Sequence, residues 1–234
     1  MDIQVPKDLD VALVLLTPNF DSALSLYLLC EKISKEKLKT KIYAGICVSA
    51  AAESLSLNAV RNFAYQISAS FPHIIDDHIR SIRYYTLNED DINQVINAQT
   101  EACKEWATTL ANEFDPSTNI VLYAIDALPL SEDHLSVMEE MYIKDLSKIK
   151  LLKDRTKLSS VSYESRSLPV IRPLNETGTT RKEVYDLLKD KNLMGLYDQT
   201  LSCNLSKKHE PIHNYNQPCG KCYGCLEREY IESL

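Results

Sequence analysis

The run Asp10-Val-Ala-Leu-Val-Leu-Leu16, followed by Thr17-Pro-Asn-Phe-Asp-Ser22, decides the fold class. The first part is apolar throughout rather than alternating, which is typical of a strand buried on both faces of a parallel sheet. The second part reads as a turn in which Asp21 or Ser22 caps a helix, and apolar residues then recur at helical spacing as far as Ile33. The stretch therefore predicts a strand, a loop and a helix.

The same alternation continues along the chain to about residue 125. Strands are expected at 41–48, 81–86 and 119–125, and helices at 51–70 and 90–113. Strands that alternate with helices of this length indicate a parallel sheet covered on both faces. We therefore predict an α/β fold, a doubly wound and mainly parallel sheet.

The sequence changes character after about residue 126. Helical spacing at 132–152 is followed by polar, serine-rich sequence at 153–167, which we interpret as a loop over the site. Residues 168–174 have the sequence pattern of the end of a short strand. Thr180 and Glu183 have the spacing of a capping box and predict the start of another helix.

Composition limits the functional class. A net charge of −7 argues against a broad duplex-binding surface, although a local basic strip that contacts an anion or a nucleic acid is left open. The first residues lack the apolar core of a signal peptide, and no apolar run approaches the length of a membrane span. We expect a cytoplasmic protein without a membrane partner.

Four cysteines near the C-terminus have the spacing of a metal site: Cys203, Cys219, Cys222 and Cys225. Four thiolates favour tetrahedral Zn²⁺ in a structural role, since they leave no open position for water. The alternatives are an iron–sulfur cluster, which usually has its fourth cysteine on the C-terminal side, and two disulfides, which are typical of secreted chains. We predict an α/β domain at 1–200 and a small zinc-binding appendage at 201–234.

The order of these parts resembles the 7-cyano-7-deazaguanine synthase (QueC) family of the ATP pyrophosphatases. The segments that carry the resemblance are Asp21-Ser22, Ile171-Arg-Pro-Leu174, Arg181-Lys-Glu183, Thr200-Leu-Ser-Cys203 and Cys219-Gly-Lys-Cys-Tyr-Gly-Cys-Leu-Glu-Arg228. The match is close over residues 174–228 and mainly architectural over residues 9–126.

The resemblance implies a fold similar to the adenine-nucleotide alpha hydrolases and a role for each matching residue. It implies that Thr17, Asn19, Asp21 and Ser22 form the pyrophosphate loop for ATP. Asp21, Arg181 and Lys182 would be catalytic, with Mg²⁺ as a cofactor, and Arg172 would lie near the substrate. Cys203, Cys219, Cys222 and Cys225 would bind the zinc ion.

The reaction that the resemblance implies has two activation steps. ATP activates the carboxylate of 7-carboxy-7-deazaguanine as an acyl adenylate, ammonia displaces AMP to give an amide, and a second activation dehydrates the amide to a nitrile. The partners would be a small 7-deazapurine and ATP, in a pathway that modifies tRNA or DNA. A homodimer is left open.

The sequence also departs from the family pattern. Pro18-Asn19 replaces a glycine pair in the first loop, and about two extra residues precede Arg181. The family's Gly-Arg-Asn segment is missing. A second hypothesis is therefore a decayed nucleotide site, retained in a binding or scaffolding protein. A third, a tRNA thiolation enzyme of the same group, is weaker because Cys30, Cys47 and Cys103 show no catalytic pattern.

Overall fold

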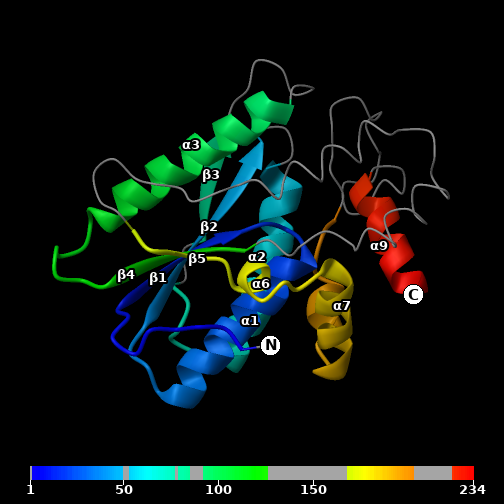
Figure 1. Cartoon of the computed structure of the whole chain (residues 1–234), viewed down its shortest axis with the longest axis horizontal. Coiled ribbons are helices and arrows are strands. Elements are labelled where there is room, and N and C mark those ends of the chain that lie inside the picture. The colour runs from blue at the N-terminus through cyan, green and yellow to red at the C-terminus, as the bar shows by residue number, and fades with distance from the viewer. Residues whose placement is uncertain (1, 50–52, 77–78, 85–91, 126–167, 203–222) are drawn as a thin grey trace.

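The computed structural model describes residues 2–49, 53–76, 79–84, 92–125, 168–202 and 223–234 (Figure 1). Within them, parallel strands form one sheet in the order β3-β2-β1-β4-β5. The strands are β1 (Val11–Leu16), β2 (Lys41–Ser49), β3 (Arg80–Tyr84), β4 (Ile120–Ala124) and β5 (Val170–Ile171). The predicted α/β class with a parallel sheet is confirmed.

The described helices alternate with the first four strands and then follow one another toward the C-terminus. They are α1 (Phe20–Glu36), α2 (Glu53–Ser70), α3 (Ile92–Ala111), α6 (Pro173–Glu176), α7 (Arg181–Asp190), α8 (Met194–Tyr197) and α9 (Tyr223–Ser233). The first three match the predicted helices to within a few residues.

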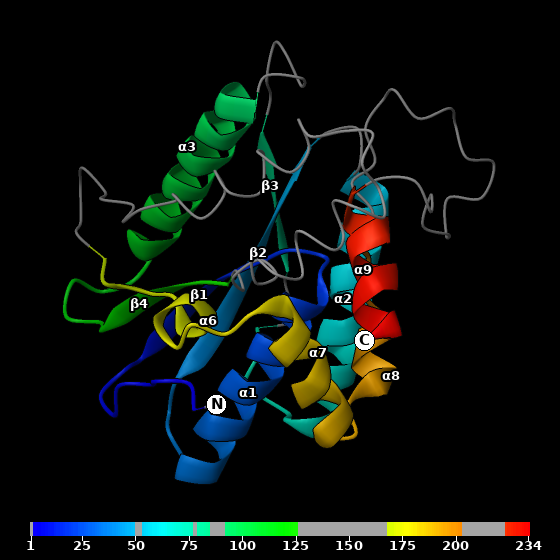
Figure 2. The same ribbon diagram turned by 45° about the vertical axis from the view of Figure 1, so that its right-hand side comes forward.

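Strand β1 lies at the centre of the sheet and is buried on both faces. Val11 and Leu13 belong to a hydrophobic cluster that includes Leu110 of α3. Ala12 and Val14 belong to a second, larger cluster that contains residues of α1 and α2. Figure 2 shows α3 on one side of the sheet and α1 and α2 on the other. The uninterrupted apolar run of β1 is explained by this double burial.

The strand order determines where a ligand can bind. The chain builds β2 and β3 outward on one side of β1 and then crosses to place β4 on the other side. The carboxyl ends of β1 and β4 therefore lie side by side where the strand order reverses direction, which is the topological switch point of this class of fold. The loop after β1, residues 17–19, lies at that point.

Two helix starts differ in how well the sequence predicted them. The capping box at α7 is confirmed: the Thr180 side chain accepts from the Glu183 backbone, and the Thr180 N–H donates to Glu183 Oε2 at 2.7 Å. The predicted cap of α1 by Asp21 or Ser22 is wrong. Asn19 is the N-cap residue, without a side-chain cap hydrogen bond, and Asp21 lies inside the first turn.

Other predictions fall partly or wholly outside the described residues. The predicted helix at 132–152 and the predicted loop at 153–167 lie wholly outside the described residues. The strand at 168–174 is shorter than the stretch suggested, because α6 begins at Pro173. The boundary between 1–200 and 201–234 stays a prediction, although Tyr230 and Ile231 of α9 belong to the same hydrophobic cluster as α1. No described helix has the length and apolarity to cross a membrane.

Gly45 of β2 is a point where the sheet tolerates no side chain. A Cβ atom there would lie 2.7 Å from Ile82 Cδ1 and 2.9 Å from the ring of Trp106. We expect Gly45→Ala to lower the free energy of unfolding by about 1–3 kcal/mol through overpacking, measured by urea denaturation. Gly195→Ala is the control, because its nearest neighbour would be Gln66 Nε2 at 3.4 Å. Equal effects of the two substitutions would contradict this account.

Candidate functional site

The loop after β1 is held in shape by its own polar groups. The Thr17 N–H donates to Ser22 Oγ at 2.9 Å, and the two hydroxyl groups are also 2.9 Å apart. The Pro18 carbonyl accepts from the Leu201 N–H at 2.7 Å. The segment just before Cys203 is therefore attached to the loop that the resemblance assigns to pyrophosphate.

Asp21 is buried at the start of α1, where the helix dipole favours a negative charge. Its Oδ2 accepts from Arg181 Nε at 3.1 Å. Its Oδ1 is buried without a hydrogen-bond partner among the described residues, as is Ser25 Oγ one turn further along α1. A buried oxygen without a donor is costly, so Asp21 Oδ1 has unused capacity to bind a ligand, a cation or water.

Arg181 is the first residue of α7 and contacts two carboxylates at once. Its Nη1 donates to Glu227 Oε2 of α9, in addition to the bond from Nε to Asp21. The side chains are 14% exposed for Arg181, 2% for Asp21 and 3% for Glu227, so both ion pairs are shielded from water. We call Asp21, Arg181 and Glu227 the charged triad. With two carboxylates and one guanidinium, its formal charge is −1.

The other two predicted cations lie differently from Arg181. Lys182 donates to both carboxylate oxygens of Asp186, at 2.6 and 2.7 Å, on its own helix. Arg172 is half-buried at the N-cap of α6, where its backbone N–H donates to Glu176 Oε1 at 2.9 Å. Of the three, the structure brings Arg181 into direct contact with Asp21.

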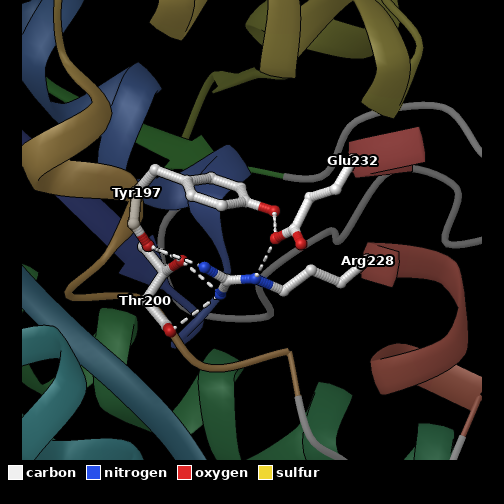
Figure 3. A network of polar contacts seen from close by, with 4 residues as sticks. All are labelled: Tyr197, Thr200, Arg228 and Glu232. Atoms are coloured by element: carbon white, nitrogen blue, oxygen red, sulfur yellow. Dashed lines mark hydrogen bonds and ion pairs between the residues drawn. The ribbon is translucent and has the colours of Figure 1, made fainter. Parts of the chain in front are cut away.

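Arg228 of α9 binds the chain just before Cys203. Its Nη1 donates to the Thr200 carbonyl at 3.0 Å and to Thr200 Oγ1 at 3.2 Å, and its Nη2 donates to the Tyr197 carbonyl at 3.3 Å (Figure 3). The guanidinium also lies over the Tyr197 ring, 3.9 Å from its centroid. The described residues on either side of 203–222 are therefore joined through one side chain.

A carboxylate completes the Arg228 network. Glu232 Oε1 accepts from Arg228 Nε at 3.1 Å and from the Tyr197 hydroxyl at 2.6 Å (Figure 3). Burial, assisted by this hydrogen bond, raises the pKa of Tyr197 well above its ordinary value. Tyr197 therefore stays protonated and donates to Glu232 throughout the neutral range.

Of the predicted zinc ligands, Cys225 lies in the described part of the chain. It is buried in the first turn of α9 and is not in a disulfide with another described cysteine. Cys203, Cys219 and Cys222 lie outside the described residues. Among the described residues, no three His, Cys, Asp or Glu side chains are grouped as a metal site.

The other cysteines are not arranged as thiolate nucleophiles. Burial raises the pKa of Cys30 to about 12. A hydrogen bond with Cys103, together with burial, raises the pKa of Cys47 as well. Both thiols remain protonated at neutral pH, and a protonated thiol is a poor nucleophile. This agrees with the absence of a catalytic pattern around Cys30 and Cys47 in the sequence.

Sequence analysis did not identify Glu227 as a site residue. A signal for it was present: its neighbours one turn away on α9 are Tyr223, Gly224, Tyr230 and Ile231, none of which carries a positive charge. A glutamate on the apolar side of a helix requires a partner from elsewhere in the fold. The sequence could not show that this partner is Arg181.

Comparison with known proteins gives only distant likenesses, and these are to solved structures. The chain matches no family model and no curated protein. Four chains of solved structure match. One is the U34-tRNA thiolase NcsA from Methanococcus maripaludis with its [4Fe-4S] cluster, at a TM-score of 0.44 and 14% identity. The match covers 97% of this chain and 66% of that one, just under two thirds of its length. The assignment of a function therefore rests on the residues of this chain.

Proposed function

We propose that the protein is an ATP-dependent enzyme that converts the carboxylate of a 7-deazapurine to an amide or a nitrile, with ammonia as the nitrogen donor. One observation carries the proposal. Asp21 and Arg181, which the resemblance assigns to one catalytic site, are 160 residues apart in sequence and in contact at the topological switch point of the sheet. This is where sheets of this class bind nucleotides.

The residues of the site suit the departure of pyrophosphate. ATP with Mg²⁺ would supply the adenylyl group and the leaving pyrophosphate. The N-terminus of α1 offers backbone N–H groups and the positive end of the helix dipole to phosphate oxygens. Arg181 is held beside it with its charge shared between two carboxylates, and Asp21 Oδ1 is a hard oxygen of the kind that Mg²⁺ prefers. Pro18 contributes no N–H donor to the loop.

The C-terminal cysteines would support this site through a structural zinc ion. Cys203, Cys219, Cys222 and Cys225 would be the ligands. Support for the proposal comes from the bonds of Arg228 to Thr200 and Tyr197, which tie the start of the cysteine segment to the helix that contains Cys225. Four thiolates would hold the ion in a closed tetrahedral site, so its role would be to fix the fold.

The test is a turnover assay with the intact protein. We expect ATP, Mg²⁺, ammonium and 7-carboxy-7-deazaguanine to yield AMP, pyrophosphate and the amide or nitrile, detected by mass spectrometry. Asp21→Asn should lower turnover at least 100-fold, because it removes the charge that holds Arg181. Glu31→Gln is the control: it lies on α1 and pairs with Lys35 and, at 3.6 Å, with Lys191, away from the switch point. Full turnover in Asp21→Asn would refute the proposed role of this residue.

The second candidate is a binding protein with a decayed nucleotide site. It is favoured by Pro18-Asn19, which replaces the glycine pair, and by the engagement of Arg181 with two buried carboxylates. Binding of the deazapurine without ATP binding or turnover would establish this candidate. The double substitution Pro18→Gly and Asn19→Gly should then raise ATP affinity about 10- to 100-fold, because one restored charge-assisted hydrogen bond contributes ~1.5–3 kcal/mol.

A further inference from the structure

We propose that Cys47 and Cys103 form a redox-active dithiol, which a peroxide or a small disulfide converts into an intramolecular disulfide that ties α3 to the sheet. Cys47 lies on β2 and Cys103 on α3, and both thiols are free and half-buried. A hydrogen bond joins them. The inference does not depend on the proposed function, because neither cysteine belongs to the candidate site.

The packing of α3 on β2 explains why the two thiols meet. The ring of Trp106 lies so close to Gly45 that a Cβ atom there would be 2.9 Å from it, and Figure 2 shows α3 on this side of the sheet. Cys47 follows Gly45 by two residues and lies on the same face of the strand. Cys103 precedes Trp106 by three residues and lies on the same side of the helix. The contact between the thiols is therefore in register with the contact between Trp106 and Gly45.

A disulfide at this point would hold a part of α3 that the core holds less firmly. Among the described side chains of α3, the buried ones are Ala107, Leu110 and Ala111, all on the C-terminal side of Cys103. They pack in the smaller hydrophobic cluster with β1 and β4. A bond from Cys103 to Cys47 would add a covalent attachment nearer to the N-terminus of the helix.

The hydrogen bond assigns the order of the chemical steps. Because it raises the pKa of Cys47, together with burial, Cys47 keeps its proton and donates it to the Cys103 sulfur. The Cys103 sulfur attacks the peroxide, gives up two electrons and becomes a sulfenic acid, with release of water. The Cys47 sulfur then displaces the hydroxyl group of the sulfenic acid, and the Cys47 proton leaves in a second water molecule. Contact between the sulfurs compensates for the low acidity of Cys47.

A small disulfide gives the same product by thiol–disulfide exchange. The Cys103 sulfur attacks one sulfur of the oxidant, which forms a mixed disulfide and releases one thiol. The Cys47 sulfur then attacks Cys103, and a second thiol leaves with the remaining proton.

Peptide mapping of the full chain tests the pairing, with hydrogen peroxide as the probe and digestion by trypsin without reductant. Trypsin places Cys47 in peptide 42–61 and Cys103 in peptide 84–104, and neither peptide has a second cysteine. We expect mass spectrometry to find these peptides linked in most chains, two hydrogen masses lighter than their sum, and separate after treatment with dithiothreitol. Absence of the link, or linkage of Cys103 mainly to a C-terminal cysteine, would refute the proposal.

Thermal unfolding and hydrogen exchange test whether the link ties α3 to the sheet. Cys103→Ser, treated in the same way, exposes the C-terminal cysteines to the same oxidant. We expect oxidation to raise the Tm of the wild type about 5–10 °C further than that of Cys103→Ser, because the disulfide restricts the unfolded chain. Amide exchange at residues 97–106 of α3 should slow at least threefold in the wild type alone.

Cys30→Ala is the matched control for this comparison. Cys30 is buried on α1, so the variant should show the same rise in Tm as the wild type. An equal rise in Cys103→Ser would assign the effect to other cysteines and refute the proposal. Linked peptides without a rise in Tm or slower exchange would refute the attachment of α3.

Discussion

Arg181→Met is expected to lower the free energy of unfolding by about 3–5 kcal/mol, because it removes the guanidinium that binds both buried carboxylates. Met has a similar volume and keeps the apolar stem, so the loss should come from the uncompensated charge rather than from a cavity. Urea denaturation followed by circular dichroism measures the change. A loss of this size is a large part of the stability of an ordinary domain.

Two further variants test whether the loss of stability in Arg181→Met is electrostatic. Glu31→Gln removes a carboxylate of α1 from ion pairs with Lys35 and Lys191, but its side chain is 21% exposed, so its cost should stay below about 1 kcal/mol. Adding Asp21→Asn and Glu227→Gln to Arg181→Met should recover most of the lost stability, because all three buried charges of the triad are then absent. Failure of the triple variant to recover would place the effect in packing rather than electrostatics.

Cys222→Ser is expected to reduce zinc from about one ion per chain to a small fraction of that. Each structural ligand is essential to a tetrahedral thiolate site, and the free energy of zinc binding is about 10–16 kcal/mol in small zinc-binding peptides. Elemental analysis of protein purified under reducing conditions measures the content. We also expect the variant to lose protection of α9 against hydrogen exchange before the sheet loses its own.

The control for the zinc prediction is Cys103→Ala. This cysteine lies on α3, within hydrogen-bonding reach of Cys47 and away from the C-terminal cysteines, so zinc content should not change. Absence of zinc from the wild type would refute the metal assignment. So would titration that finds the four C-terminal thiols paired as disulfides.

Local patterns in the sequence predicted most of the sheet. The apolar run of β1, the alternation that follows it and the capping box of Thr180 and Glu183 all depend on neighbours within a few residues, and the structure contains each of them. The resemblance also placed Asp21 and Arg181 in one site, and they are in contact. The first three features depend only on residues close together in sequence, and the common site of Asp21 and Arg181 came from the family resemblance. None of them required a contact between distant residues to be deduced from the sequence.

The sequence by itself determined the α/β alternation, because the side-chain period of a strand or helix is written along the chain. Only the tertiary structure decided which charged residues pair with one another. Asp21 pairs with Arg181 and is not the N-cap of α1, and Glu227 reaches the same guanidinium from α9. Which charged residues meet depends on how the helices pack around the sheet, and no local pattern in the sequence records that packing.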